Sequence, residues 1–358
     1  MRRTCGTQCF IPPHVLARAA RNGNDEQRSF AVQTLLRDQT IRMARLQNAK
    51  VRAGGPREGA DALAVQARPR PNRIIRDARG GETVDGRVVR KEGEGPIGDE
   101  AADQAYDALG DTFTFFVKAY GRNSIDDAGM PLRGVVHYGQ QYANAFWDGK
   151  RMVFGDGDGV LFSSLTGSLD VIGHELTHGV IEDEAELEYL GQSGALNESV
   201  SDVFGSLVKQ YKLRQRAEDA DWLIGPDVFS PGIRGDALRS MKAPGTAYDD
   251  PALGNDDQPA DMDHYLETVE DNGGVHINSG IPNHAFYVTA TTLGGWAWER
   301  AGRIWYDSLR DAVLKPTADF ATFAATTLLM AERTFGRNSE EVDAVKAGWE
   351  KVKVAPTG

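Results

Sequence analysis

The chain has little cysteine, no long apolar run and no excess of positive charge. Only Cys5 and Cys9, both near the N-terminus, occur among its 358 residues, so a disulfide framework is excluded for the body of the chain. The absence of a run of about 18 apolar residues excludes a membrane-spanning helix. The formal net charge of −12 argues against nucleic acid as a partner, because phosphate binding needs a basic face. Two arginines follow Met1 without an apolar stretch behind them, so we expect no classical signal peptide.

Charge is unevenly distributed along the chain. Residues 1–70 carry 13 Lys and Arg against 5 Asp and Glu, whereas the remainder carries 27 against 47. Such a basic segment can be a solvated tail, or it can dock on the acidic remainder. Residues 53–71 are rich in Ala, Gly, Pro and Arg, a composition typical of a flexible connector where proteases cut. We therefore place a boundary near residue 70.

Hydrophobic spacing predicts the fold class. Helical spacing occurs at 24–48 and 99–120, and 131–163 alternates apolar and polar residues between glycines, which predicts β-hairpins. From residue 168 onward the patterns are mostly helical. A β-rich half followed by an α-helical half predicts an α+β fold with a cleft at the junction. The later helices are expected at 168–182, 194–213, 281–292, 297–315, 318–335 and 339–352.

The strongest chemical signal is the motif H-E-x-x-H, which here reads His174-Glu175-Leu176-Thr177-His178. On a helix, positions i and i+4 lie on one face, so both imidazoles can bind one Zn²⁺. Glu175 lies on the same side and can reach a metal-bound water. A catalytic zinc needs a third protein ligand, and Glu198 follows on a second expected helix. Asp202, one turn further, can accept the second N–H of a ligand histidine and fix its tautomer.

These residues lie in segments that resemble the thermolysin-like zinc neutral proteases. The resemblance covers roughly residues 98–352 and its motifs are in the expected order. The N-terminal CFIPPHVL at 9–16 is similar to the propeptide motif of the protealysin-like branch of that family. The other matching segments are VHYGQQYANAFWDGKRMVFGDGDG at 136–159, HELTH at 174–178, SGALNESVSD at 193–202, GDALRSM at 235–241 and DNGGVHINSGI at 271–281.

The resemblance implies a two-subdomain zinc endopeptidase made as a zymogen. Residues 1–70 would form a small helical propeptide and linker, and the zinc helix would run along the cleft floor. Residues 71–190 would form the β-rich N-terminal subdomain and 191–358 the helical C-terminal subdomain. The basic propeptide would cover the cleft in cis, with Ile11-Pro12-Pro13 rigid and extended, and would be released by a cut between 50 and 75.

The resemblance also implies a role for each site residue. The zinc ligands would be His174, His178 and Glu198, and Glu175 would be the general base. Tyr189 and His276 would stabilise the oxyanion, with Asp271 orienting His276 and Asp202 standing behind a zinc histidine. Substrate would bind to Asn144, to the backbone of Ala145 and, through the carbonyl of the residue after the scissile bond, to Arg239. The specificity pocket would be lined by Phe162, Leu165, Val171, Ile224, Val228 and Leu238. All six are apolar, which predicts cleavage before bulky residues such as Leu, Phe or Ile, although ordinary core residues would look the same.

One departure from this pattern and the two N-terminal cysteines each lead to a hypothesis. The family's paired calcium site keeps Asp170 and Asp221, but Lys209, Leu223 and Pro226 replace its other positions, and Ca²⁺ needs six to eight oxygen ligands. We expect that this calcium site is lost and that the Lys209 ammonium substitutes for calcium charge; a single calcium ion near Asp236 stays open. A second hypothesis is that a thiolate of Cys5 or Cys9 caps the zinc, with reduced bystander cysteines as the alternative.

Two other functions stay open at this point. One is a latent binding protein with a metalloprotease fold, and the other is a zinc aminopeptidase, which would need an acidic anchor for the substrate's amine. Intact Glu175, Tyr189 and His276 argue against the first, and DNGGVHINSGI fits an endopeptidase better than the second. We expect a monomer whose partners are protein or peptide substrates, its own propeptide and a protein inhibitor, with no nucleic acid or membrane. Family members are often secreted, so the compartment stays open between the cytoplasm and export by a non-classical route.

Overall fold

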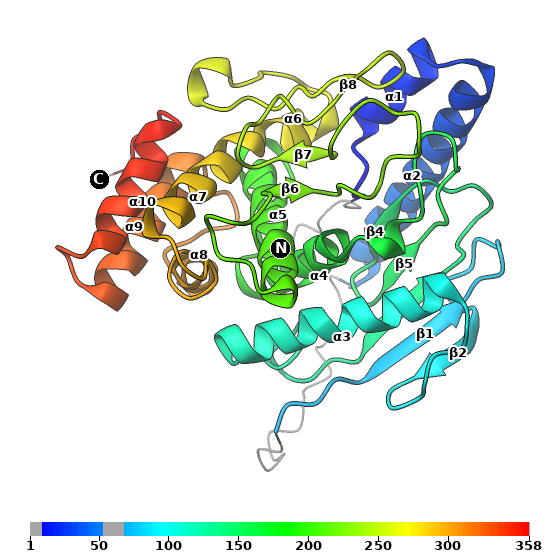
Figure 1. The fold of residues 1–358 in the computed structure, drawn as a ribbon, viewed down its shortest axis with the longest axis horizontal. Coiled ribbons are helices and arrows are strands. Elements are labelled where there is room, and N and C mark those ends of the chain that lie inside the picture. Colours follow the sequence, from blue (N-terminus) through cyan, green and yellow to red (C-terminus); the bar gives the residue numbers. More distant parts are fainter. Residues whose placement is uncertain (1–8, 53–67, 358) are drawn as a thin grey trace.

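The computed structural model describes residues 9–52 and 68–357, with the side chains of 43–52 excepted. The N-terminal unit consists of a short extended segment at 9–11 followed by α1 (Pro13–Asn22) and α2 (Asp25–Arg52). Pro13 begins α1. Proline has no N–H, but an N–H in the first turn of a helix would have no intrahelical partner in any case. In Figure 1, α2 lies beside β4 (Ala145–Trp147) and β5 (Met152–Phe154), away from the C-terminal helices, and α1 packs against α2.

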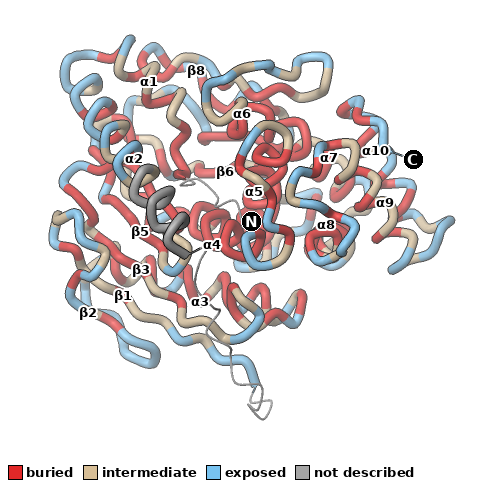
Figure 2. Tube along the Cα trace, turned by 180° about the vertical axis from the view of Figure 1, so that it is seen from behind, coloured by how far each residue is buried: buried red, intermediate tan, exposed pale blue. Residues whose placement is uncertain are grey.

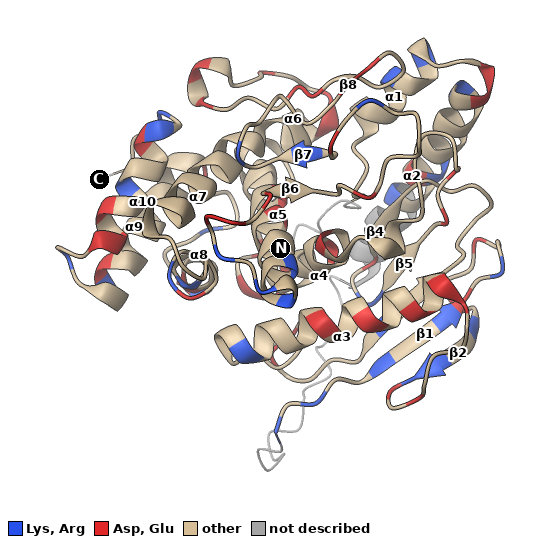
Figure 3. Cartoon of the chain, in the orientation of Figure 1, with Lys and Arg blue, Asp and Glu red and all other residues tan. Residues whose placement is uncertain are grey.

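This N-terminal unit is docked on the body of the chain. Arg18 forms an ion pair with Asp257, and Arg37 forms another with Glu82 at 2.8 Å. Acidic residues are scattered over the loops and helices of the body (Figure 3). Of the two alternatives for the basic segment, docking is therefore observed for its described part, while most of the expected connector lies outside the described residues.

A five-stranded sheet forms the N-terminal part of the body, in the order β2-β1-β3-β5-β4. Strand β3 pairs in parallel with both β1 and β5, whereas β4 and β5 form an antiparallel hairpin. The prediction of hairpins at 131–163 is thus right for β4–β5 and wrong for β3. The chain reaches β3 from the β1–β2 pair through α3 (Glu100–Tyr120), and such a crossover allows parallel pairing. The strands are β1 (Arg73–Asp77), β2 (Arg87–Lys91), β3 (Leu132–Val136), β4 (Ala145–Trp147) and β5 (Met152–Phe154).

Two central helices connect this sheet to the C-terminal half. They are α4 (Leu169–Glu184) and α5 (Gly191–Leu213), and both are buried along most of their length (Figure 2). Glycines allow their close approach, because a Cβ on Gly173 would lie 3.1 Å from the Cα of Gly205. Five helices follow: α6 (Asp271–Asn278), α7 (Gly280–Leu293), α8 (Ala301–Arg310), α9 (Phe320–Phe335) and α10 (Glu340–Lys351).

The remaining elements are short. Two-stranded ribbons pair β6 (Leu223–Ile224) with β7 (Arg239–Ser240) and β8 (Asp249–Asp250) with β9 (Gly254–Asn255), and single 3₁₀ turns occur at Leu165–Gly167 and Met262–His264. The α+β fold class, with its sheet in the N-terminal part and helices in the C-terminal half, is confirmed. Within the described residues, no helix is long and apolar enough to cross a membrane.

Candidate active site

Three buried side chains from α4 and α5 converge on one point. His174 and His178 lie one helical turn apart on α4, and their Nε2 atoms are 3.0 Å from each other. Glu198 on α5 places Oε2 3.5 Å from the His174 nitrogen and Oε1 3.5 Å from the His178 nitrogen. Among the described residues, these are the three side chains whose ligand atoms are grouped closely enough to hold a metal ion.

Both histidines have the tautomer that metal binding at this point requires. His174 Nδ1 donates to Asp202 Oδ1 at 2.7 Å, and His178 Nδ1 donates to Asn197 Oδ1 at 2.8 Å, with Ser201 Oγ 2.9 Å away. Burial, together with neighbouring His174, lowers the pKa of His178 well below its ordinary value. Each Nε2 therefore presents a lone pair toward the other, an arrangement that a shared cation stabilises.

Asp202 connects the first histidine to Arg239. Its carboxylate accepts hydrogen bonds from Arg239 Nε and Nη2, both at 2.8 Å, and from Asn283 Nδ2 at 2.9 Å. Burial alone would raise the pKa of Asp202, but Arg239 and His174 outweigh it and hold that pKa well below its usual range. Arg239 Nη1 is buried and makes no hydrogen bond within the described part of the chain. A guanidinium fixed on one side and unsatisfied on the other is suited to bind a carbonyl.

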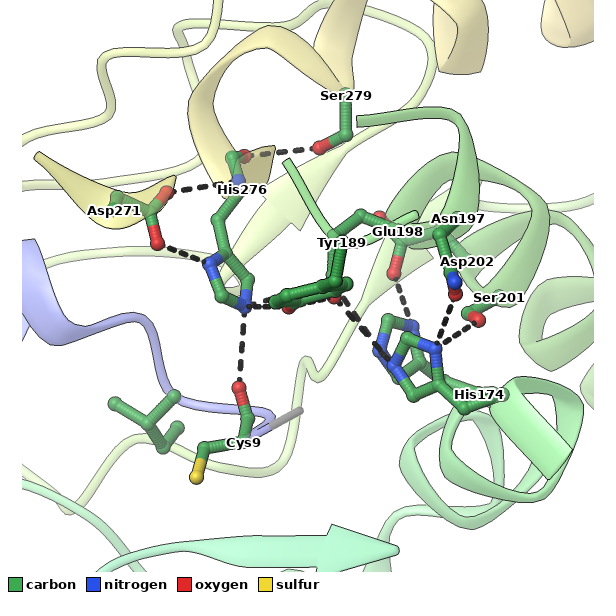
Figure 4. Close-up of polar contacts among 12 residues, drawn as sticks. Cys9, His174, Tyr189, Asn197, Glu198, Ser201, Asp202, Asp271, His276 and Ser279 are labelled. Atoms are coloured by element: carbon green, nitrogen blue, oxygen red, sulfur yellow. Dashed lines mark hydrogen bonds and ion pairs between the residues drawn. The ribbon is translucent and has the colours of Figure 1, made fainter. Parts of the chain in front are cut away.

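From α6, His276 faces the group that could hold a metal, with its Nε2 3.6 Å from Glu198 Oε2. Its Nδ1 donates to Asp271 Oδ1 at 2.7 Å, and Tyr189 Oη lies 3.2 Å from its Nε2 (Figure 4). Burial would lower the pKa of His276, but the Asp271 and Glu198 carboxylates raise it above its ordinary value. Positive φ angles at Asp271 and the three residues after it bend the backbone so that the carboxylate returns to the imidazole. The tyrosine hydroxyl also donates to Glu198.

Glu175 is oriented by the sheet. Its Oε2 accepts a hydrogen bond at 3.0 Å from the backbone N–H of Trp147 at the end of β4. The side chain is completely buried on the helix that carries both histidines. A carboxylate held beside a metal site without being one of its ligands can accept a proton from a bound water.

Comparison with known proteins agrees with this geometry. Residues 65–182 match the catalytic domain of thermolysin metallopeptidases, and residues 185–354 match their alpha-helical domain. The chain belongs to the thermolysin metallopeptidase family. It is a zinc-dependent metalloendopeptidase made with a propeptide, and nothing in the comparisons supports the binding-protein or aminopeptidase alternatives.

Several relatives match over nearly the whole chain. An extracellular metalloprotease of Pectobacterium carotovorum subsp. carotovorum is 53% identical, covering 96% of this chain and 95% of that protein. Protease PrtS of Photorhabdus sp. (strain Az29) is 44% identical, covering 96% and 91%. The solved precursor of protealysin, a metalloproteinase from Serratia proteamaculans, superposes with a TM-score of 0.86 at 50% identity over 97% of this chain and all of that one. The chain thus resembles the protealysin branch of its family.

The segment at 9–11 runs along β4, antiparallel to it. Phe10 N–H donates to the Ala145 carbonyl at 3.1 Å. Asn144 pairs with Ile11 twice, accepting from its N–H at 2.8 Å and donating to its carbonyl at 3.2 Å. The Cys9 carbonyl accepts a hydrogen bond of 3.2 Å from His276 Nε2 (Figure 4). The propeptide therefore occupies the cleft through its backbone.

The cysteine hypothesis is not supported for Cys9. Its thiol hydrogen-bonds Asp38 of α2, and its sulfur is not part of the group that could hold a metal. Figure 4 shows the sulfur pointing away from His276. The carbonyl faces the site because the strand pairing with β4 fixes the peptide plane. Cys5 lies outside the described residues.

Phe10 fills an apolar pocket beside the metal ligands. Its ring is completely buried, lies edge-on to His174 with centroids 5.3 Å apart, and is 4.8 Å from the Arg239 guanidinium carbon. A Cβ on Gly225 would lie 3.1 Å from the tip of the ring, so this glycine leaves room for it. The six residues expected to line the pocket are all buried in the same hydrophobic cluster as Phe10: Phe162, Leu165, Val171, Ile224, Val228 and Leu238.

Several site residues were not found from the sequence. Asn197 and Ser201, which orient His178, lie inside the segment SGALNESVSD, so helical spacing from Glu198 could have indicated them. Gly225 and Asn283 carry no comparable signal. The first is a glycine in a loop, and the second is an asparagine on a buried helix face whose partner, Asp202, is far away in the sequence.

A buried carboxylate of α2 also reaches the segment that leads into β4. Asp38 accepts hydrogen bonds from Tyr142 Oη at 2.6 Å and from Asn144 Nδ2 at 2.9 Å. Burial raises the pKa of Asp38 from 3.8 to about 6. Burial lowers the pKa of His14, which lies 4.0 Å from Asp271, from 6.5 to about 4. The docked state therefore favours a protonated Asp38 and a neutral His14.

These two groups give opposite pH dependence to propeptide docking. We expect docking in Asp38→Asn to weaken as the pH falls from 6.5 to 4, because undocked His14 then takes up the proton. In His14→Gln, docking should weaken as the pH rises from 3.8 to 6, because undocked Asp38 then ionises more readily. In wild type the effect of His14 at low pH and the effect of Asp38 at higher pH offset each other, so propeptide docking should depend only weakly on pH. The pH dependence of docking is measured by hydrogen exchange of α1 and α2, in a Glu175→Ala background and with correction for intrinsic exchange rates. The same pH dependence in both variants would contradict the prediction.

Lys209 lies at the expected calcium position. Its ammonium is 3.0 Å from Asp170 Oδ2 and 3.1 Å from Asp221 Oδ1, and it donates to the Leu223 carbonyl at 2.7 Å. Gly225 N–H donates to the same oxygen of Asp170 at 3.2 Å. Burial would lower the pKa of Lys209, but the two carboxylates raise it, so the ammonium stays charged. The arrangement agrees with the hypothesis that this cation takes the place of calcium charge.

Thermal stability should therefore not depend on calcium. We expect the Tm in zinc-replete buffer to be unchanged by EGTA, as measured by circular dichroism. Lys209→Met, which leaves Asp170 buried without its cation, should reduce the free energy of unfolding by about 3–5 kcal/mol. A large drop in the wild-type Tm with EGTA would instead indicate a calcium site.

Proposed function

We propose that the mature enzyme hydrolyses peptide bonds on the amino side of bulky apolar residues. The observation that carries this is Phe10, whose ring lies in the pocket beside His174 and Arg239 while its N–H pairs with the Ala145 carbonyl. A substrate side chain of the same kind can take this place once the propeptide has left. Burying it contributes about 1.5–3 kcal/mol.

The chemistry follows from the arrangement of the chain's own groups. His174, His178 and Glu198 would hold Zn²⁺, which would lower the pKa of a bound water to about 7 and polarise the substrate carbonyl. Glu175 takes the proton from that water and returns it to the departing nitrogen. Together, Tyr189 Oη and His276 Nε2 donate to the carbonyl oxygen as it becomes negative, which is worth roughly 2.7–4 kcal/mol for one donor.

We assign the alignment of the substrate to residues at the start of β4 and on β7. The Ala145 carbonyl pairs with the backbone of the pocket residue and Asn144 with that of the residue after it, as they do with Phe10 and Ile11 of the propeptide. Arg239 offers its unsatisfied Nη1 to the carbonyl that follows the scissile bond. Asp202 and Asp271 act indirectly, because each holds a donor or a ligand in place.

We also propose the wider organisation that the sequence predicts. Residues 1–70 are removed as propeptide and linker, and 71–190 and 191–358 form the two catalytic subdomains. The mature enzyme is a monomer, exported as the names of its relatives suggest, and open to control by a protein inhibitor.

Peptide cleavage tests the specificity. After activation by limited trypsin treatment, peptides with Leu, Phe or Ile after the scissile bond should have kcat/KM values about 10- to 150-fold above those with Ala or Asp there. Val228→Phe, which fills the pocket next to Gly225, should shift the preference to smaller residues. A preference set by the residue before the bond, with none for the residue after it, would sink this assignment.

A further inference from the structure

The geometry points to a self-cleavage site inside the propeptide. We propose that the precursor hydrolyses its own Cys9–Phe10 peptide bond in cis and that the shortened N-terminal segment, beginning at Phe10, stays docked in the cleft. This inference rests on the proposed function of the same site, and it names the first substrate of that site.

Backbone pairing fixes the direction and register of the segment. Phe10 and Ile11 are joined to Ala145 and Asn144 by three hydrogen bonds of 2.8 to 3.2 Å, and Cys9 bridges antiparallel to Phe146. These are the bonds expected of a substrate whose pocket residue is Phe10. The peptide bond before the pocket residue is then the one at the reacting position.

The reacting groups surround that bond. On one side, the Cys9 carbonyl accepts the hydrogen bond from His276 Nε2. On the other side, the ring of Phe10 packs against His174, one of the three metal ligands. The Cys9–Phe10 bond therefore has an oxyanion donor at its carbonyl (Figure 4), and the side chain that follows the bond lies against a residue of the metal group.

The neighbouring bonds of the described segment are poorly placed. Pro12 and Pro13 have no N–H to pair with β4, and Pro13 begins α1, where the chain is no longer extended. Helical backbone cannot lie along a strand as a substrate does. Among the described propeptide residues, the bond before Phe10 is the one in substrate register.

Water is the only other reactant that this hydrolysis needs. The water oxygen adds to the Cys9 carbonyl carbon while Glu175 accepts a proton from the water. The carbon–nitrogen bond to Phe10 breaks, and the proton passes to the Phe10 nitrogen. The products are a carboxylate on Cys9 and an amino group on Phe10.

The propeptide can stay docked after this cleavage, because most of its contacts with the body are made by residues C-terminal to the cleaved bond. Arg18 pairs with Asp257 and donates to the Asn255 carbonyl at 2.8 Å. Arg37 pairs with Glu82. Phe10 itself stays on the retained side of the cut. Loss of residues 1–9 therefore leaves a latent enzyme that still needs a cut in the connector.

The mass and N-terminus of the full-length chain test the proposal. The chain is purified without zinc, Zn²⁺ is added, and intact mass and N-terminal sequence are followed with time. We expect loss of residues 1–9 and a new N-terminus at Phe10, with a first-order rate that dilution does not change. Glu175→Ala, and wild type kept in chelator, should stay whole.

Two variants separate peptide hydrolysis from other causes. Cys9→Ser should still be cut at the same bond, because the thiol takes no part. Phe10→Leu should be cut before residue 10, because Leu also fits the pocket. A cut at another bond in these variants would overturn the assignment of the register.

The outcome distinguishes this inference from the proposed function. If the connector is cut but the released propeptide still contains the Cys9–Phe10 bond, the enzyme is active and the self-cleavage proposal is wrong. A rate that rises with protein concentration overturns cleavage in cis. If no bond is cut and the trypsin-activated chain hydrolyses no peptide, the proposed function fails together with this inference.

Discussion

Glu175→Gln should strongly reduce the rate of peptide hydrolysis while the chain still folds and binds zinc. General acid–base catalysis contributes about 10²- to 10⁴-fold, so we expect kcat to fall by that factor. The substitution preserves shape, and an amide oxygen can still accept the hydrogen bond of Trp147 N–H. The metal ligands are untouched, because Glu175 is not among the three residues grouped around the metal position.

The measurement needs an enzyme whose activation does not depend on its own activity. Limited trypsin treatment of the arginine-rich connector gives mature wild type and variant alike. Comparing kcat, zinc content and circular dichroism then separates chemistry from folding. His174→Ala is the matched control, since it should lose zinc as well as activity. A Glu175→Gln enzyme that retains most of the wild-type kcat would refute the role of Glu175 as the proton carrier.

The group that could hold a metal could be predicted from the sequence because the spacing of its members is local. His174 and His178 are four residues apart on one helix, and Glu198 lies on the next helix. Two glycines, Gly173 and Gly205, let these helices approach closely enough for the three side chains to meet. Here the sequence pattern and the packing point to the same residues.

The contacts of the propeptide could not be predicted in this way. Asp38 bonds to Asn144 across 106 residues, and the Cys9 carbonyl meets His276 across 267. Hydrophobic periodicity carries no information on such a pairing, because the pairing depends on how segments far apart in the sequence pack together. The parallel pairing of β3 was missed for a related reason. An alternating pattern indicates a strand but not the direction of its neighbours.

The charge pattern predicted part of the docking: that the N-terminal segment binds an acidic surface, but not which residues pair. An excess of arginine in residues 1–70 indicates that the segment has an acidic partner, without telling which one. In the structure Arg18 meets Asp257 and Arg37 meets Glu82, both at the edge of the docked surface. Exposed pairs of this kind contribute little free energy each, so they orient the propeptide more than they hold it.

The largest share of the docking free energy should come from Phe10, and Phe10→Ala should therefore activate the uncut precursor. Truncating a buried Phe to Ala costs about 3–5 kcal/mol. If the whole cost falls on docking, the undocked fraction rises about 150- to 5,000-fold. The variant also removes the aromatic ring from beside the Arg239 guanidinium and His174. The freshly purified full-length variant should hydrolyse a peptide substrate that the wild-type precursor leaves untouched.

The comparison must be made before the connector is cut. Initial rates on a fluorogenic peptide are measured while a denaturing gel shows the chain whole, and zinc content is measured in parallel. Leu36→Ala is the matched control, because Leu36 is an exposed apolar residue of α2 whose truncation should leave latency unchanged. A Phe10→Ala precursor that stays as latent as wild type would mean that the helices and their polar contacts, including Asp38, hold the propeptide without its anchor in the pocket. Activation would instead establish that latency depends on the same apolar pocket that selects the substrate, so that any peptide able to fill the pocket competes directly with the propeptide.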